Sequence, residues 1–374
     1  MSMAIGQRQH GSVIIVTLWT ITLMTILVTV IASQNRLSAD TAWVHKQELT
    51  VWASQQSAIN QAEMEVMMAR MPLPVAEQQK MNDVSAQSLN KARRNPLYRY
   101  NGQLLGLAYP QAQDLAVRIY DHAGKINLRE ISRPRLRALI EKKLGGAKAD
   151  SDQIDHMMDA WNDWLDLNDG ESPKGAEKKY YLSLPVPYTP RNGALETVEE
   201  LLSIKGFAEV FGDVDLDAAF TVYGEDELVN LNVATVEAMQ LLPGLDAPLI
   251  EKIVAWRKDN EFQGNGDVAQ LVPPEKMADL RSWINSRKTT NYYTIMVYAQ
   301  AGGKDAEQGK DDNSKQNIDK TDQSNTHKQA AQTAYAETVS LSSPTERPFV
   351  LKINPYQKLP LLPASLAAAD EARP

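Results

Sequence analysis

The residues best suited to chemistry form an acidic turn near the middle of the chain. Calcium prefers carboxylate and carbonyl oxygens, and a turn rich in acids supplies them. With Asp166 as the first position, Asn168 falls third and Glu177 twelfth, as in an EF-hand loop. The fifth position is Gly170, and the sixth, where an EF-hand needs glycine, is Glu171. The spacing excludes an EF-hand and leaves two interpretations: an irregular calcium loop, or an acidic turn that closes a helix.

A second pattern that could bind a ligand is a helix-hairpin-helix. The turn Pro243-Gly244-Leu245 separates two expected helices, at 236–241 and 248–258. Glycine permits the tight turn, and the backbone amides of such a turn can face a phosphate. DNA binding also needs basic residues around the hairpin. Acids outnumber bases here, with Glu237, Asp246, Glu251 and Asp259 against Lys252, Arg257 and Lys258. The composition therefore favours a packing role over DNA binding.

The chain carries no catalytic motif. It has no Cys, which excludes disulfides, Cys-ligated zinc and a thiol nucleophile. Its five His residues are scattered, and there is no nucleophile elbow, zinc-protease motif or phosphate-binding glycine loop. The net charge of −8 argues against nucleic acid as the main partner. We therefore expect a binding or structural protein and not an enzyme.

The N-terminal segment contains an apolar run long enough to span a membrane. Residues 13–32 contain no charge, no Gly and no Pro. At about 1.5 Å per residue, such a run spans roughly 30 Å, the thickness of a bilayer core. Its Thr hydroxyls can bond to carbonyls three or four residues back. An apolar repeat then continues without helix breakers to Pro72, which predicts one helix over 12–72 with an amphipathic outer half. A signal anchor and a secretory signal cleaved after Ala32 are the alternatives.

This start resembles the N-terminus of type IV pilins and type II secretion pseudopilins, whose leader is cut after a Gly. The resemblance implies a leader over residues 1–11, with cleavage between Gly11 and Ser12. Most family members carry Glu where this chain has Val16, and that Glu pairs with the N-terminal amine of a neighbouring subunit. A subunit at the tip has no such amine to meet, and an unpaired carboxylate in an apolar bundle is costly. In the family, the K-type minor pseudopilin lacks this Glu.

Strand patterns both precede and follow a long helical block. We expect strands at 115–120, 292–298, 334–341 and 348–353, with helices from about 132 to 286 between them. The predicted fold class is α+β: a pilin-like long N-terminal helix packed on a small antiparallel sheet, with a large inserted all-α domain. The expected bounds are 73–125 and 290–358 for the sheet domain, 126–289 for the inserted domain, 302–329 for a disordered inter-strand loop and 359–374 for a loose tail.

Several segments of the helical block are also similar to the K-type minor pseudopilin. They are Trp161, Asp163-Trp164-Leu165-Asp166, Gly175-Ala176-Glu177, Tyr180-Tyr181, and Asn230-Leu231-Asn232 running into the Leu-Pro-Gly turn. The inserted domain of that family holds calcium. The resemblance therefore implies calcium as the cofactor, with Asp166, Asn168, Asp169, Glu171 and Glu177 as candidate ligands.

The resemblance implies a minor pseudopilin at the tip of a periplasmic pseudopilus, which starts or caps assembly. The chain is expected to cross the inner membrane once, with its C-terminal domain in the periplasm. Expected partners are other minor pseudopilins in a heterotrimeric tip complex, the major pseudopilin, and the prepilin peptidase that cleaves and methylates the start. The alternatives are a minor pilin of a type IV pilus or DNA-uptake machine that binds DNA through the hairpin, and a secreted calcium-dependent protein.

Overall fold

The computed structural model describes residues 10–70, 100–105, 115–285, 289–299, 333–343 and 345–361. The chain divides into two compact units, Met1–Gln56 and Ser57–Pro374. Most of the expected leader, the expected loop at 302–329 and the tail beyond residue 361 lie outside the described residues. The two units are described separately below.

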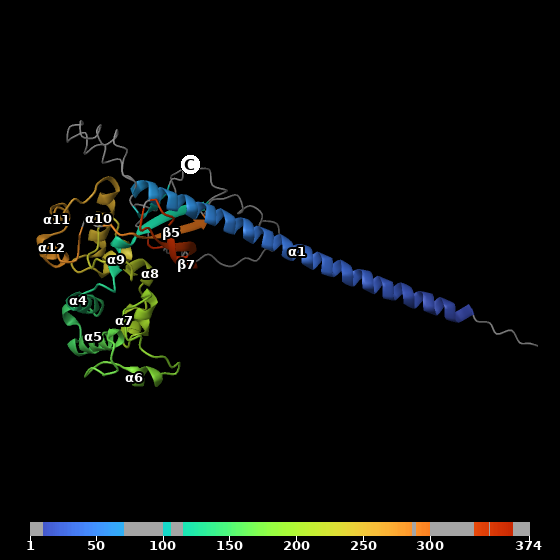
Figure 1. Cartoon of the computed structure of the whole chain (residues 1–374), viewed down its shortest axis with the longest axis horizontal. Helices are drawn as coiled ribbons and strands as arrows, with labels where there is room; N and C mark the ends of the chain where they lie inside the picture. The colour runs from blue at the N-terminus through green and yellow to red at the C-terminus, as the bar shows by residue number, and fades with distance from the viewer. Residues whose placement is uncertain are drawn as a thin grey trace, which may run out of the picture. The chain divides into compact units, whose positions relative to one another are not determined.

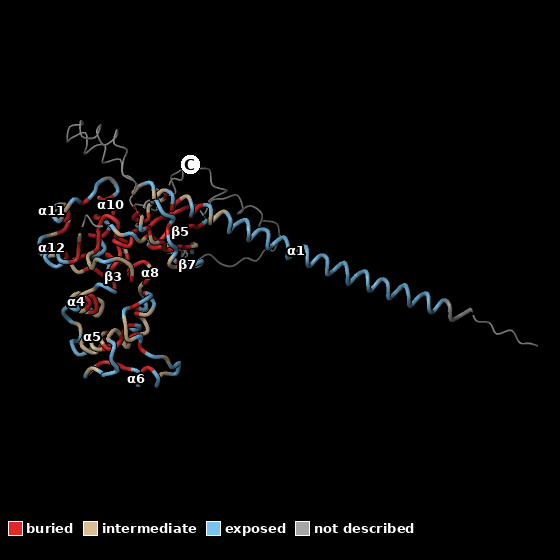
Figure 2. Tube along the Cα trace, viewed as in Figure 1, coloured by how far each residue is buried: buried red, intermediate tan, exposed pale blue. Residues whose placement is uncertain are grey.

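The first helix, α1, runs from His10 to Arg70 and has 61 residues. It begins slightly before the expected start at Ser12 and ends just before Pro72, because a residue preceding proline is biased away from helical backbone angles. Among the described helices, α1 is long and apolar enough to cross a membrane. Every large apolar side chain from residue 14 to residue 31 is exposed, between 48% and 71% (Figure 2).

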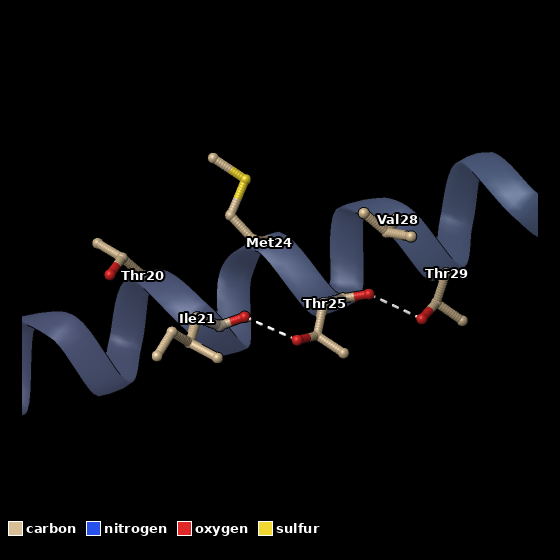
Figure 3. A pocket seen from close by; sticks show the side chains of 6 residues that line it. All are labelled: Thr20, Ile21, Met24, Thr25, Val28 and Thr29. Atoms are coloured by element: carbon tan, nitrogen blue, oxygen red, sulfur yellow. Dashed lines mark hydrogen bonds between the residues drawn. The ribbon is translucent and has the colours of Figure 1, made fainter.

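Threonine hydroxyls in this apolar part of α1 are satisfied within the helix. Thr25 donates to the carbonyl of Ile21 at 2.8 Å, and Thr29 donates to the carbonyl of Thr25 at 2.7 Å (Figure 3). Further donations run from Thr17 to Ile14, from Thr20 to Thr17 and from Thr22 to Leu18. The expected back-bonding is thus confirmed, and these hydroxyls do not oppose burial in lipid.

The second unit contains a five-stranded antiparallel sheet in the order β1-β2-β5-β6-β7. The strands are β1 (Asn101–Leu104), β2 (Leu115–Asp121), β5 (Tyr292–Ala299), β6 (Thr333–Ser340) and β7 (Phe349–Lys358). The expected strands are confirmed, although β7 continues past its expected end at residue 353. It contains Pro355, which an edge strand tolerates because one side makes no ladder bonds.

One face of this sheet packs against the last part of α1. Ala58, Ile59, Ala62 and Val66 are at most 2% exposed. They form one apolar cluster with residues that alternate along the strands, among them Val117, Ile119, Ile295, Val297 and Val339. Alternate residues of a strand point to one face of a sheet, and residues three or four apart lie on one face of a helix. The contact joins these two faces. The α+β fold with a long N-terminal helix and a small antiparallel sheet is therefore confirmed.

Most of the remaining elements are helices that share one continuous apolar core, from Ile126 to Ile284. They are α4 (Arg133–Lys143), α5 (Ser151–Leu165), α6 (Lys178–Leu182), α7 (Phe207–Phe211), α8 (Leu216–Ala219), α9 (Val236–Leu241), α10 (Ala247–Asp259), α11 (Asn265–Val268) and α12 (Pro274–Leu280), with 3-10 turns η1 (His122–Gly124), η2 (Gly146–Lys148) and η3 (Val198–Ser203) (Figure 1). The region is not purely helical, because β3 (Ile126–Asn127) and β4 (Phe220–Thr221) form a parallel pair.

A carboxylate joins the two places where the chain passes between the sheet and the helical core. Asp121, at the end of β2, accepts hydrogen bonds from the amides of Ala123 and Thr290 and from the Thr290 hydroxyl, at 2.8, 3.2 and 2.8 Å. Arg70 donates to the carbonyls of Thr290 and Leu341. Burial raises the pKa of Asp121 to about 6. The end of α1 and both crossing segments are thus held at one point.

Candidate functional site

The acidic turn is held in place by Asp163, in the last turn of α5. This residue is fully buried, and its carboxylate accepts hydrogen bonds from the amides of Ser172 and Ala176. A Cβ on Gly175 would lie 1.8 Å from Asp163 Oδ2, so only glycine fits there. Asp163 therefore folds the turn back onto its own helix.

Three of the candidate ligands lie in the first part of the turn. Asp166 Oδ1 accepts from the amide of Asn168 at 3.1 Å, and Asn168 Oδ1 accepts from the amide of Gly170 at 2.7 Å. Asp169 Oδ1 accepts from Asn192 Nδ2 at 3.1 Å. Asn192 has a left-handed φ of 51° and comes from the segment between α6 and η3. A second loop thus closes over the acidic turn.

Glu177 contributes a buried carboxylate beside this turn. It is 3% exposed, and its Oε2 accepts from the amide of Lys178 at 3.2 Å. Its Oε1 is buried without a hydrogen-bond partner, as is Oδ1 of Asn192. Burial raises the pKa of Glu177, and neighbouring aspartates raise it further. These aspartates are Asp163, Asp166 and Asp169. These two buried oxygens lack hydrogen-bond partners and lie near several carboxylates. A hard cation prefers such oxygen ligands and would satisfy them.

Glu171 does not join the other candidates. It is exposed, and within the described ranges no hydrogen bond or ion pair connects it to the other candidate ligands. Across the same residues, no three His, Asp or Glu side chains converge closely enough to hold a metal ion as they stand. A cation here would require Asp166 and Asp169 to exchange their present donors for the ion, with Glu177 and Asn192 already facing inward.

The helix-hairpin-helix turn packs inside the protein. Gly244 has φ +77°, and a Cβ there would lie 2.3 Å from the carbonyl oxygen of Lys276 in α12. Lys142 in α4 donates to the carbonyls of Leu242 and Leu245 at 2.5 and 3.1 Å. Burial lowers the pKa of Lys142 to about 8. The turn is therefore engaged by α4 and α12 of its own chain, which is the geometry of a packing element.

A small polar cavity of about 20 Å³ lies where the sheet meets the helical core, and its lining includes His122. That volume accommodates about one water molecule. The His122 ring nitrogens lie 2.7 Å from the Thr221 hydroxyl and 2.8 Å from the Thr294 hydroxyl. Burial lowers the pKa of His122 well below its usual range. This His is a satisfied structural group that links β4 to β5.

The predicted processing site lies at the start of α1. Gly11 and Ser12 fall within the helix, and Val16 is 60% exposed. No acid occurs in α1 before Asp40. The apolar segment therefore contains no carboxylate.

Sequence reasoning did not assign roles to Asp163 or Asn192. For Asp163 a signal existed, because it lies in the segment Asp163-Trp164-Leu165-Asp166 that is similar to the K-type minor pseudopilin. For Asn192 no local signal existed, since its role depends on how the segment after α6 returns to the acidic turn.

Comparisons with known proteins converge on one family. The family model described as type II secretion system (T2SS), protein K, matches residues 124–211, which hold α4 to α7 and the acidic turn. The type II secretion system protein K of Pectobacterium carotovorum subsp. carotovorum is 30% identical over 119 residues, and the match spans 31% of this chain and 32% of that protein.

A solved structure is also similar, the crystal structure of the GspK-GspI-GspJ complex from the type 2 secretion system of enterotoxigenic Escherichia coli. The match has a TM-score of 0.42 and 13% identity, and it covers 79% of this chain and 98% of that one. The chain is thus similar to type II secretion system protein K over residues 124–211, and its match spans about a third of the length of the curated relative.

Proposed function

We propose that this chain is a minor pseudopilin that occupies the tip of a periplasmic pseudopilus and starts or caps its assembly. The observation that carries this proposal is α1, a 61-residue helix whose apolar start contains no acid before Asp40. Similarity to type II secretion system protein K over residues 124–211 supports a role in type II secretion.

The exposed apolar side chains at the start of α1 need lipid or other proteins to cover them. Thirteen large apolar residues between 14 and 31 are exposed in the isolated chain. Exposure of such a continuous apolar surface to water is unfavourable, so either lipid or other helices must cover it. Lipid would cover it before assembly, with a single pass through the inner membrane. Helices of other minor pseudopilins and of the major pseudopilin would cover it in the fibre.

The absence of a carboxylate at Val16 is the basis of the tip assignment. A buried carboxylate near the start of a packed helix needs the amine of the subunit above it. With valine at this position, the chain has no such requirement and can stand at the end of the fibre. We propose that prepilin peptidase cleaves after Gly11 and methylates Ser12, as the resemblance implies.

A calcium ion in the acidic turn is a further part of the proposal. The residues that would hold it are Asp166, Asp169 and Glu177, together with Asn192. Their support is the pair of orphaned buried oxygens, Glu177 Oε1 and Asn192 Oδ1. The ion would neutralise the charges that now raise the pKa of Glu177 and would cross-link two loops in a chain without disulfides.

Fibre length tests the tip role. In cells that overproduce the major pseudopilin, fibres should be longer without this chain and shorter when it is co-produced at increasing levels. Val16→Glu should weaken this shortening, and Val16→Leu is the matched control. Fibre length that does not respond to the chain would overturn the tip assignment.

The DNA-binding alternative has its own test. Purified full chain in detergent should bind DNA weakly, because the hairpin turn is engaged by α4 and α12. Tight, strongly salt-dependent binding in a filter assay would favour a DNA-uptake pilin instead.

A further inference from the structure

Strand β7 concentrates exposed apolar side chains at the edge of the sheet. Val350, Ile353 and Tyr356 are 37%, 56% and 80% exposed. Large exposed side chains on an edge strand are usually avoided or blocked, since they invite association. We call these three residues the β7 patch. Phe349 of the same strand is also 70% exposed.

Register places the β7 patch on the face of the sheet that α1 covers. Val350 pairs with Val339, and Ile353 pairs with Glu337. Directly paired residues of antiparallel strands point to the same face. Val339 belongs to the apolar cluster under α1, so Val350 and Ile353 extend that same face beyond the helix.

The remaining exposed residues of β7 are placed by the same pairing. Tyr356 falls in the irregular stretch between the Ala336–Asn354 and Ala334–Gln357 pairs, opposite Tyr335. Phe349 pairs with Ser340, the neighbour of Val339, and therefore points to the opposite face.

The carboxylate of Glu337 lies directly beside this patch, because Glu337 pairs with Ile353, and Glu63 interacts electrostatically with Glu337. Glu337 is 3% exposed and accepts a hydrogen bond from the Tyr335 hydroxyl at 3.0 Å. Glu63 of α1 is 6% exposed, and within the described part of the chain it makes no hydrogen bond or ion pair. Its pKa is raised by burial and by the charge of Glu337, and lowered by the charge of Arg347. Arg347 itself is exposed and forms no ion pair with either acid among the described residues.

This arrangement is incomplete in the isolated chain. A carboxylate at the base of an apolar surface is costly until a cation reaches it. A positive charge from a partner protein, placed beside Glu63 and Glu337, would offset that cost. It would also fix the position of the partner along the strand.

We propose that the β7 patch is the docking surface for a neighbouring pseudopilin, which presents a Lys or Arg flanked by apolar side chains to Glu63 and Glu337. The inference rests on the proposed function and specifies which surface of the chain makes that contact. Charge complementarity selects this partner, because a second copy of the chain would bring the same acid pair. A lipid surface would offer no fixed cation between apolar groups.

Site-specific photo-crosslinking tests this assignment in the full chain, co-expressed with the other pseudopilins of its own secretion system and extracted in detergent. A photoreactive residue at position 353 should crosslink to another pseudopilin, and the crosslinked peptide should contain Lys or Arg. The same residue at position 349 is the matched control on the opposite face and should give much less product. Equal products from both positions, or crosslinks to a second copy of this chain, would overturn the proposal.

Substitution of the acid pair gives a second readout. The variant with Glu63→Gln and Glu337→Gln removes the charges and keeps the shape, so its melting temperature should not fall. Co-purification with the crosslinked pseudopilin should weaken by about tenfold or more, because the partner's cation would be left unpaired. Unchanged co-purification would refute the role of the acids. If the unsubstituted chain retained no pseudopilin at all, the proposed function would fail with it.

Discussion

The two parts of α1 present apolar side chains in opposite ways. Ile59 and Ala62 are completely buried against the sheet, whereas Ile21 and Leu23 are 66% and 67% exposed. Both parts belong to one helix. The difference lies in what the chain provides to cover them. The last part is completed by the chain's own strands, and the first part requires lipid or other subunits.

A pair of truncations should give the largest contrast between these two parts. Ile59→Ala removes a fully buried side chain and should lower the free energy of unfolding of the full chain in detergent by about 2–5 kcal/mol. Ile21→Ala should change it by less than about 0.5 kcal/mol, since detergent covers that residue in both states. Equal losses in denaturant titrations would contradict the division.

Asp121 tests the contact that holds the end of α1 to the two crossing segments. Burial raises its pKa to about 6 from an ordinary value of 3.8, so the folded chain holds its proton over a pH range where the unfolded chain has lost it. Stability should fall as pH rises from about 4 to about 6, and the penalty should persist above 6. Between pH 4 and pH 7, the stability difference should shift by about 2 kcal/mol in favour of Asp121→Asn. The measurement is thermal unfolding at stepped pH, and parallel curves for the two proteins would refute the assignment.

Calcium should stabilise the helical core through the acidic turn, and the response should depend on Glu177 but not on Glu171. If the acidic turn binds the ion, calcium at about 100 times its dissociation constant should add about 2.7 kcal/mol of stability, and chelator should remove it. Glu177→Gln should abolish this response. Glu171→Gln should leave it intact, because Glu171 stands apart from the other candidates. A melting temperature that ignores both calcium and chelator would show that the turn is not a stabilising site.

The smallest effect is expected in the apolar part of α1. Thr25→Val removes a hydroxyl that is already bonded to the carbonyl of Ile21. Membrane fractionation and unfolding should therefore change little, by less than about 0.5 kcal/mol. Release of the variant from membranes would mean that this hydroxyl has a partner outside its own helix.

Local patterns predicted much of this fold. The run of apolar residues without Gly or Pro predicted α1, and strand-like runs at 115–120, 292–298 and 334–341 predicted β2, β5 and β6. The end of β7 was missed because Pro355 argues against a strand unless it is known to lie at an edge. The β3–β4 pair was missed because each strand has only two residues and its partner lies far away in sequence.

The candidate site was predictable in composition but not in geometry. The acidic residues between 166 and 177 indicated hard-cation chemistry, but spacing could not separate Glu177, which faces inward, from Glu171, which is exposed. The contribution of Asn192 depends on a loop closure that no local pattern encodes. The electrostatic interaction of Glu63 with Glu337 likewise arises only when the end of α1 packs on the sheet.

The intact mass of the chain extracted from membranes tests the central claim most directly. A pseudopilin must keep its whole apolar segment, so the mature chain should begin at Ser12, with or without one methyl group. A chain that begins at Ser33, or that is recovered free of the membrane, would have lost the helix on which the tip assignment depends. That result would contradict the account.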